Sequence, residues 1–213
     1  MTIENMHIWF DILQDKYNTP YFTAAERDHF INDAALDFVL EFLHEDKDGN
    51  KGLEDTPYSN MALKNILLTV PVTAASALLT TAAISTAISA ADMIVPVKIR
   101  PQTVNTRSAK FTRHQDIDED LNNTLSDLAA SSPRASYVIQ DDGIQIYPTT
   151  DYAVVVFDMV ILVAPTDAVH SASTDLVDLP GFTHRKIVAK ALVKTGLVTE
   201  DQAISLMDGV TAG

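Results

Sequence analysis

The chain of 213 residues contains no cysteine, and its 15 Lys and Arg stand against 29 Asp and Glu, which gives a formal net charge of −14. This composition excludes disulfide bonds and thiolate metal sites. It also argues against a protein that holds nucleic acid over a broad face, because phosphate neutralisation requires clustered Lys and Arg. With 46 % hydrophobic residues, the chain can bury a sizeable core in one domain or in two small ones.

Two amphipathic helices are predicted near the N-terminus. In the first, apolar residues recur at intervals of three and four: Ile3, Met6, Phe10 and Leu13. The second begins with a capping box, because Thr23 is followed three residues later by Glu26. Its apolar stripe consists of Phe30, Ile31, Ala34, Ala35, Phe38, Val39, Phe42 and Leu43, and its other face carries Asp33, Asp37, Glu41 and Glu45. We expect this acidic face to meet water or a neighbouring subunit.

The polar loop that follows resembles the opening of a calcium-binding loop. Asp46, Asp48 and Asn50 occupy the first, third and fifth ligand positions. The match ends there, because Lys51 replaces the glycine of the sharp turn and Pro57 replaces the bidentate glutamate. The three residues are therefore a weak candidate metal site, and an exposed polar turn is the alternative.

Neither membrane insertion nor export is expected. No residue from Asn65 to Ala91 is charged, a run long enough to span a bilayer, but it is rich in Ala, Thr and Ser and contains Pro71. We expect this segment to be buried, to face another subunit or to become ordered on assembly. Residues Thr2 to Asn5 are uncharged or acidic where an export signal would be basic, so we expect synthesis in the cytoplasm.

The middle of the chain has the pattern of strands, from about residue 92 to 165. The β-branched, proline-containing run Met93 to Pro101 predicts an edge strand or an extended arm. Asp142-Gly143 predicts a two-residue hairpin turn that would place Ile139 opposite Ile146. A long apolar strand is predicted over residues 152–163, interrupted by Asp158 and ended by Pro165.

Helix returns after Leu179-Pro180-Gly181, with Gly196 as the C-terminal cap, and a short helix is predicted to begin at Thr199 with Gln202 completing a capping box. Residues 184–195 contain four bases and no acid: Arg185, Lys186, Lys190 and Lys194. We expect these bases to form a partner-binding surface, with a solvated helix face as the alternative.

The sequence therefore predicts an α+β fold in which N- and C-terminal helices are packed with a central antiparallel β-rich region. We expect one protomer of four parts: a helical part (1–64), the uncharged segment (65–91), a β-rich part (92–178) and a helical part (179–213).

Residues that carry catalytic chemistry are not grouped in any familiar motif. The seven glycines form no phosphate-binding loop, and the six histidines are scattered, which is typical of surface or packing residues. The acidic run Asp116, Asp118, Glu119 and Asp120 is typical of a solvated loop, although it could supply paired carboxylates. We expect no enzymatic activity, no catalytic residue and no cofactor.

Several blocks of the sequence form a recognisable series. They are Phe22–Ala34 with Phe38–Phe42, the turn Gly52-Leu53-Glu54, Tyr137–Ile139 with Ile144–Tyr147, Met159–Pro165, and Asp178–Val188. This series resembles that of the head-to-tail connector, or adaptor, proteins of tailed bacteriophages, notably of the crAss-like phages of Bacteroidetes. The chain differs from that family in its uncharged run and in Arg185 and Lys186, where the family has acidic residues.

The resemblance implies a structural virion protein without an active site. Such adaptors form a ring, here expected to contain twelve copies, between the portal protein and an adjacent tail or neck protein. The ring would seal the junction at the portal vertex after synthesis in the host cytoplasm, and DNA would pass through it without sequence-specific binding, since an acidic wall repels phosphates. The bases at 185, 186, 190 and 194 would dock on a ring of opposite charge. The alternatives are another virion structural protein (a tail-completion, tail-tube or minor capsid component) or a calcium-dependent binding module.

Overall fold

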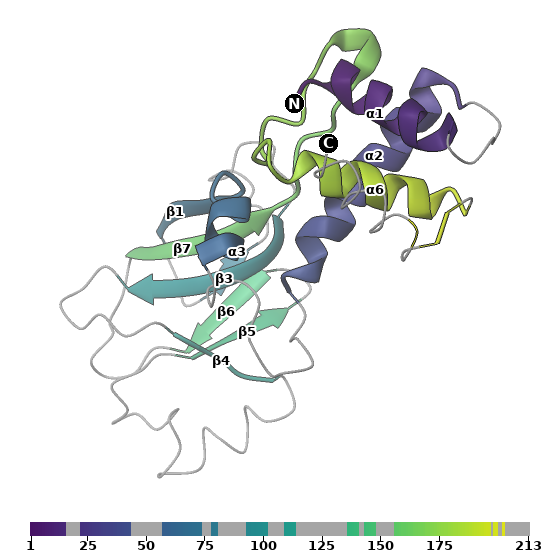
Figure 1. Cartoon of the computed structure of the whole chain (residues 1–213). Helices are drawn as coiled ribbons and strands as arrows, with labels where there is room; N and C mark the ends of the chain where they lie inside the picture. The colour runs from purple at the N-terminus through teal and green to yellow at the C-terminus, as the bar shows by residue number, and fades with distance from the viewer. Residues whose placement is uncertain are drawn as a thin grey trace. The chain divides into compact units, whose positions relative to one another are not determined.

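The computed structural model describes residues 1–15, 22–43, 57–73, 78–80, 93–101, 109–113, 136–140, 143–147, 156–196, 198–199 and 202 (Figure 1). The chain divides into two compact units, one formed by Met1–Ile66 with Ala164–Gly213 and the other by Leu67–Val163. The helical unit thus combines both ends of the chain, and the β unit is formed by its middle. This is the α+β class that the sequence predicts, with helices at both ends and a largely antiparallel centre.

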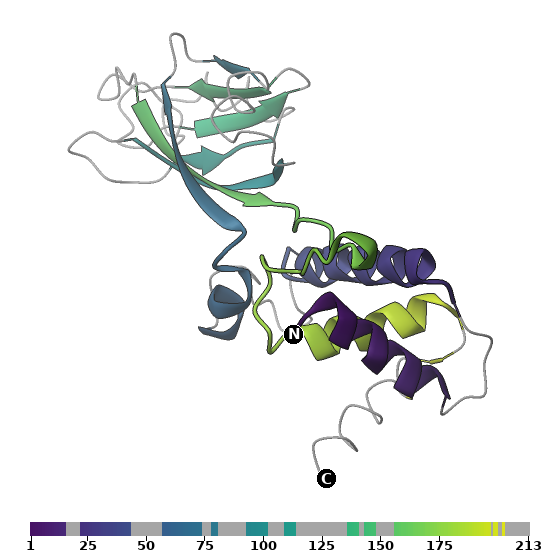
Figure 2. The same ribbon diagram turned by 90° about the horizontal axis from the view of Figure 1, so that it is seen from above.

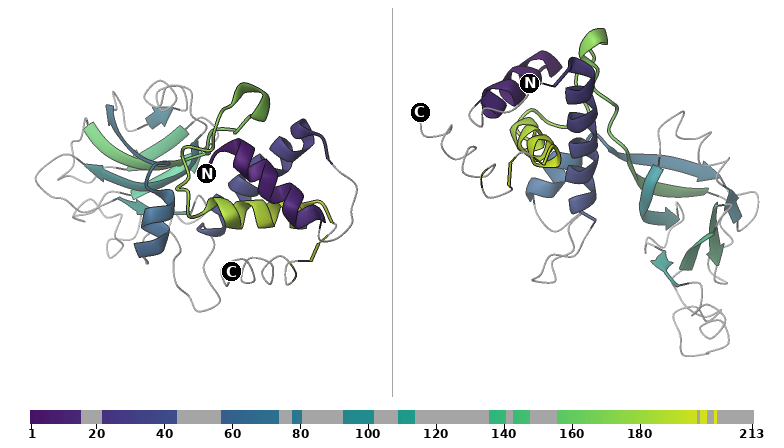
Figure 3. Two further views of the ribbon diagram at one scale, coloured as in Figure 1. Left: turned by 45° about the horizontal axis from the view of Figure 1, so that its top comes forward. Right: turned by 90° about the vertical axis from the view of Figure 1, so that its right-hand side faces the viewer.

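The helical unit contains α1 (Ile3–Asp15), α2 (Ala24–Glu41), α3 (Pro57–Leu63), the short 3-10 helix η1 (His170–Ala172) and α6 (His184–Lys194). Helix α6 packs against both α1 and α2, as Figures 2 and 3 show. All four apolar positions predicted for the first helix are buried in α1: Ile3, Met6, Phe10 and Leu13. The buried side chains of α2 are Ile31, Ala34, Ala35, Phe38 and Val39, and those of α6 are His184, Ile187, Val188, Ala189, Ala191 and Leu192. The stripe predicted for α1 and five of the eight positions predicted for α2 therefore belong to the core of this unit, whereas Phe30, Phe42 and Leu43 are half-buried.

Helix ends follow the predicted capping residues. The Thr23 side chain accepts a hydrogen bond from the backbone N–H of Glu26, and the Glu26 carboxylate accepts one from the backbone N–H of Thr23 at 2.8 Å. Gly196 has a φ of 74°, the left-handed conformation that ends a helix and favours glycine. Thr199 and Gln202 form the reciprocal pair predicted for a last capping box. Each cap supplies partners for backbone groups that the helix itself leaves free.

The described strands of the β unit form two sheets. One has the order β1 (Leu67–Thr73), β7 (Val156–Val163), β3 (Met93–Pro101), and the other the order β2 (Leu78–Thr80), β6 (Gly143–Tyr147), β5 (Ser136–Gln140), β4 (Lys110–Phe111). All pairings are antiparallel except that of β4 with β5. Strand β3 lies at an edge of its sheet, as its prolines predict, and two register shifts interrupt its pairing with β7.

The predicted hairpin forms, but its predicted register is wrong. Ile139 pairs with Ile144 instead of Ile146, and Ile146 pairs with Tyr137. This register places the buried Tyr137 and the buried Ile146 opposite each other, an aromatic and β-branched pair of the kind that stabilises antiparallel strands. Because the difference is two residues, every side chain keeps its predicted face of the sheet.

Three further features concern the continuity and extent of the β strands. Strand β7 continues through Asp158, which lies opposite Pro71 on one neighbour and Arg100 on the other, so this half-buried acid does not interrupt it. The β-rich part ends at Val163, and residues 164–178 belong to the helical unit. The uncharged segment contributes strands β1 and β2 to the β unit, one to each sheet.

Candidate functional site

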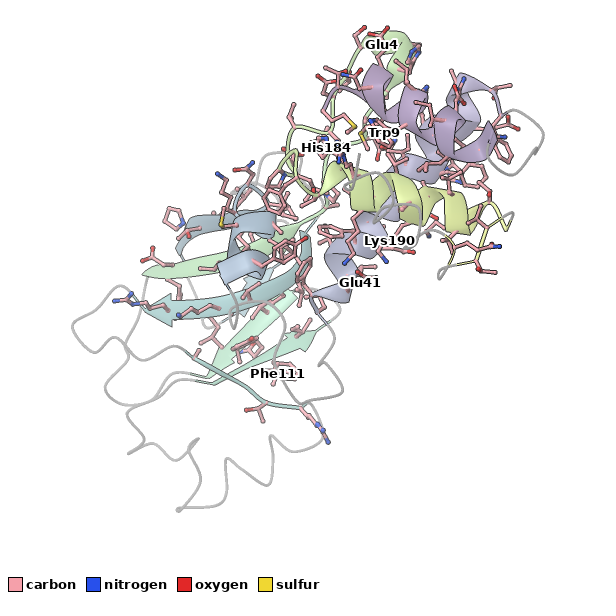
Figure 4. The ribbon with its side chains drawn as sticks, in the orientation of Figure 1. Glu4, Trp9, Glu41, Phe111, His184 and Lys190 are labelled. Atoms are coloured by element: carbon pink, nitrogen blue, oxygen red, sulfur yellow. The ribbon has the colours of Figure 1, made fainter. Side chains whose placement is uncertain are left out.

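An ion-pair ladder joins α2 to α6. Lys194 Nζ lies 2.5 Å from Asp33 Oδ2 and 2.6 Å from Asp37 Oδ2. Lys190 pairs with Glu41, and Lys186 Nζ lies 3.7 Å from the other oxygen of Glu41 (Figure 4). Since residue numbers rise along α6 as they fall along α2, the two helices run antiparallel. Three of the four acids predicted to meet water or a neighbouring subunit, Asp33, Asp37 and Glu41, thus pair with bases of their own chain and stay about half exposed, and Glu45 lies outside the described residues.

Lys194 is the most strongly engaged cation of this ladder. Its partial burial acts to lower its pKa, but the hydrogen bonds and negative charges of Asp33 and Asp37 outweigh that effect, so the pKa of Lys194 is raised above its ordinary value. Its side chain is 25 % exposed, whereas those of the two acids are 46 % and 48 % exposed, so water screens the pairs in part. The ladder stabilises helix packing and keeps Lys194 charged at any physiological pH.

Of the four bases predicted to bind a partner, only Arg185 contacts no carboxylate among the described residues. It is exposed, and its guanidinium carbon lies 4.9 Å from the centroid of the Trp9 ring on α1. This cation–π contact holds the guanidinium over an aromatic face while its N–H groups can still donate to an incoming acid. Lys186, Lys190 and Lys194 pair with acids of their own chain, so Arg185 is the base of this predicted surface whose charge has no carboxylate partner among the described residues.

Exposed apolar side chains lie next to the start of α6. The rings of Tyr58 on α3 and Phe182 are 5.6 Å apart, and Met61 follows one helical turn after Tyr58. Tyr58 is 47 % exposed, Phe182 is 50 % exposed and Met61 is 60 % exposed. We call Tyr58, Met61 and Phe182 the aromatic surface. Sequence reasoning missed it, because α3 is too short to show a periodic pattern and Phe182 precedes α6 in a turn.

A cluster of polar groups, of which His7 is buried and Asp28 and His170 are half-buried, lies where α1, α2 and η1 meet. The Nε2 atom of His7 is 2.7 Å from Oδ1 of Asp28, and the His7 ring stacks on His170 with centroids 4.6 Å apart and an angle of 9° between planes. Burial lowers the pKa of His7, and the charge of Arg27 and the neighbouring His170 act in the same direction, while the hydrogen bond to Asp28 and its charge oppose them. A neutral His7 that donates from Nε2 satisfies this geometry.

An open hollow of about 440 Å³ lies beside the first residues of α1. Its titratable side chains already have backbone partners. Asp175 Oδ1 accepts a hydrogen bond from the N–H of Ile3 at 2.7 Å, and the ring nitrogens of the buried His184 lie 3.0 and 2.8 Å from the carbonyl oxygens of Met1 and Leu179. These groups hold chain segments together, and we assign the hollow no chemistry.

Several predicted features lie outside the described residues. They are the weak metal candidates Asp46, Asp48 and Asn50, the acidic run at residues 116–120, and the turn Gly52-Leu53-Glu54. Within the described ranges, no three His, Asp or Glu side chains are grouped to hold a metal ion. The helices in those ranges include none whose length and apolar character would let it cross a bilayer.

Neither a protein-family model nor a curated protein sequence matches this chain.

Proposed function

We propose that this chain is a structural protein of a phage virion that forms an oligomeric ring in the neck, between the portal and the tail. One observation carries the proposal: the blocks that resemble connector proteins coincide with the main structural elements. Phe22–Ala34 spans the capped start of α2, Tyr137–Ile139 and Ile144–Tyr147 lie in β5 and β6, Met159–Pro165 covers the end of β7, and Asp178–Val188 leads into α6. Each of these four blocks thus lies in a helix or strand or leads into one, and the block Gly52-Leu53-Glu54 lies outside the described residues.

The charge of the protein suits a passage for DNA. The chain carries a net charge of −14, and the lysines of α6 that stood out in the sequence are paired with Asp33, Asp37 and Glu41. A wall of this kind releases few counterions on meeting a duplex and so gains little from holding it. DNA would slide along such a surface without being captured.

The surface that contacts another subunit or the portal is expected at the N-terminal end of α6. Phe182 and Arg185 are both exposed there, and Phe182 belongs to the aromatic surface. Interfaces are enriched in aromatic residues, Met and Arg, which combine a large apolar area with directed hydrogen bonds. The proposed contact pairs this surface with an acidic, partly apolar partner.

Mass photometry of the purified chain, alone and with portal assemblies, tests the proposal. We expect rings, or monomers that join the portal when it is added. A double substitution, Phe182→Ser with Arg185→Gln, should weaken the association, whereas Arg113→Gln, at an exposed arginine of the β unit, should not. Stable monomers that neither associate nor bind the portal would contradict the proposal, and binding to tail components alone would favour another virion structural role.

A further inference from the structure

The chain between β7 and α6 is attached to the helices by a few polar contacts. The side chain of Asn32 donates to the carbonyl oxygen of Ala168 and accepts from its N–H, both at 2.9 Å. One helical turn earlier on α2, Asp28 Oδ2 accepts from the backbone N–H of His170 at 3.1 Å. The two hydrogen bonds between Asn32 and Ala168 join neutral groups that do not titrate. Asp28, by contrast, also accepts a hydrogen bond from the side chain of His7.

Asp28 links two elements at once. Its Oδ1 atom accepts from Nε2 of the buried His7, and its Oδ2 atom accepts from η1. The rings of His7 and His170 stack almost in parallel. The carboxylate of Asp28 and the ring of His7 therefore both hold η1. His7 is only 4 % exposed, which leaves water little access to a charge formed there.

Added protons change each of these contacts. The charged groups facing His7 are Asp28 and Arg27 on α2 and the titratable His170 on η1, and Arg27 is itself paired with Asp11 on α1. A proton on His7 creates a buried cation beside Arg27 and against the His170 ring, and among the described residues the carboxylate of Asp28 opposes this cost. Because burial lowers the pKa of His7, the neutral stack is the state that the fold favours.

We propose that His7, Asp28 and His170 form an acid-sensitive latch, which fastens residues 169–174 to α1 and α2 at neutral pH and releases them when His7 takes up a proton. The release is local. Ala168 stays attached through Asn32, and Asp175 stays attached through the N–H of Ile3, on either side of the released turn.

Amide hydrogen exchange measured by NMR on the full chain at pH 7.5 and 5.5 tests the latch. Protection factors, corrected for the intrinsic rate at each pH, should fall about tenfold at the His170 amide relative to the Ala168 amide. His7→Gln retains a donor to Asp28 but cannot titrate, so it should abolish this pH response. The matched control His29→Gln, at an exposed histidine of α2, should retain it.

An unchanged ratio in the wild-type chain, or a ratio that still falls in His7→Gln, overturns the latch. If His7→Gln does not fold, the wild-type titration decides. The ring signals of His7 and the amide of His170 should then shift with one midpoint, and separate midpoints would overturn the proposal.

Discussion

Removing the charge of Lys194 should destabilise the helical unit. Lys194 pairs with Asp33 and Asp37 at 2.5 and 2.6 Å, and both acids are close to half exposed. Exposed pairs contribute about 0.2–1 kcal/mol each, so Lys194→Gln should cost roughly 1 kcal/mol of the free energy of unfolding. Lys194→Glu replaces attraction by repulsion and should cost about 2 kcal/mol. Adding Asp37→Lys to Lys194→Glu restores one of the two pairs and should recover about half of that loss.

Urea unfolding followed by tryptophan fluorescence reports on the helical unit, because Trp9 is the only tryptophan of the sequence and lies in α1. With a slope of about 2 kcal/mol per molar urea, Lys194→Gln should lower the midpoint by roughly 0.5 M. The difference should shrink in 1 M NaCl, where charges are screened within about 3 Å. The control Lys64→Gln, at an exposed lysine without an acid partner among the described residues, should leave the midpoint unchanged. An unchanged midpoint in Lys194→Gln, or no recovery with Asp37→Lys, would refute an intrachain ladder.

Further expectations concern caps, core and pH. Thr23→Ala removes the capping box and should cost about 1 kcal/mol in the same assay. In Gly196→Ala the added Cβ would meet no atom within 4 Å, but the alanine would have to adopt a φ of 74°. Backbone strain alone should therefore cost about 1 kcal/mol. Phe38→Ala empties a fully buried position and should cost about 3–5 kcal/mol, visible as lost helical circular dichroism at low urea. Because the pKa of His7 is lowered in the fold, its contribution to stability is complete above about pH 6.5 and is lost as the pH falls. Urea unfolding at pH 8 and at pH 5.5 would measure this loss. An equal loss of stability in His7→Gln would contradict the assignment to His7.

Features that depend on local spacing were predictable from the sequence. The stripe of α1, the capping box at Thr23 and Glu26, and the left-handed Gly196 each depend on residues within a few positions of one another. The edge position of β3 also follows from local chemistry, because its prolines lack the N–H groups that a central strand needs. These features needed no knowledge of what packs against them.

Features that depend on pairing between distant residues were not predicted. The acids at 33, 37 and 41 and the bases at 186, 190 and 194 share the same four-residue spacing, and this match was the available signal for two antiparallel helices joined by a ladder. His7, Asp28 and His170 come together from three separate segments, and nothing near any of them in the sequence indicates the others. The hairpin register was mispredicted for a related reason, since burial of Tyr137 against Ile146 set it instead of the dipeptide Asp142-Gly143.

The function that we propose is a ring of this chain between portal and tail. An electron cryomicroscopy reconstruction of the neck of the intact particle tests it most directly, because the antiparallel helices α2 and α6 and the sheets of the β unit can each be sought separately in the density. We expect closed rotational symmetry around the DNA passage directly below the portal, with Phe182 and Arg185 at a subunit or portal contact and the α2–α6 ladder inside each copy. Density for this chain in the capsid shell or along the tail tube, or its absence from the particle, would contradict the claim.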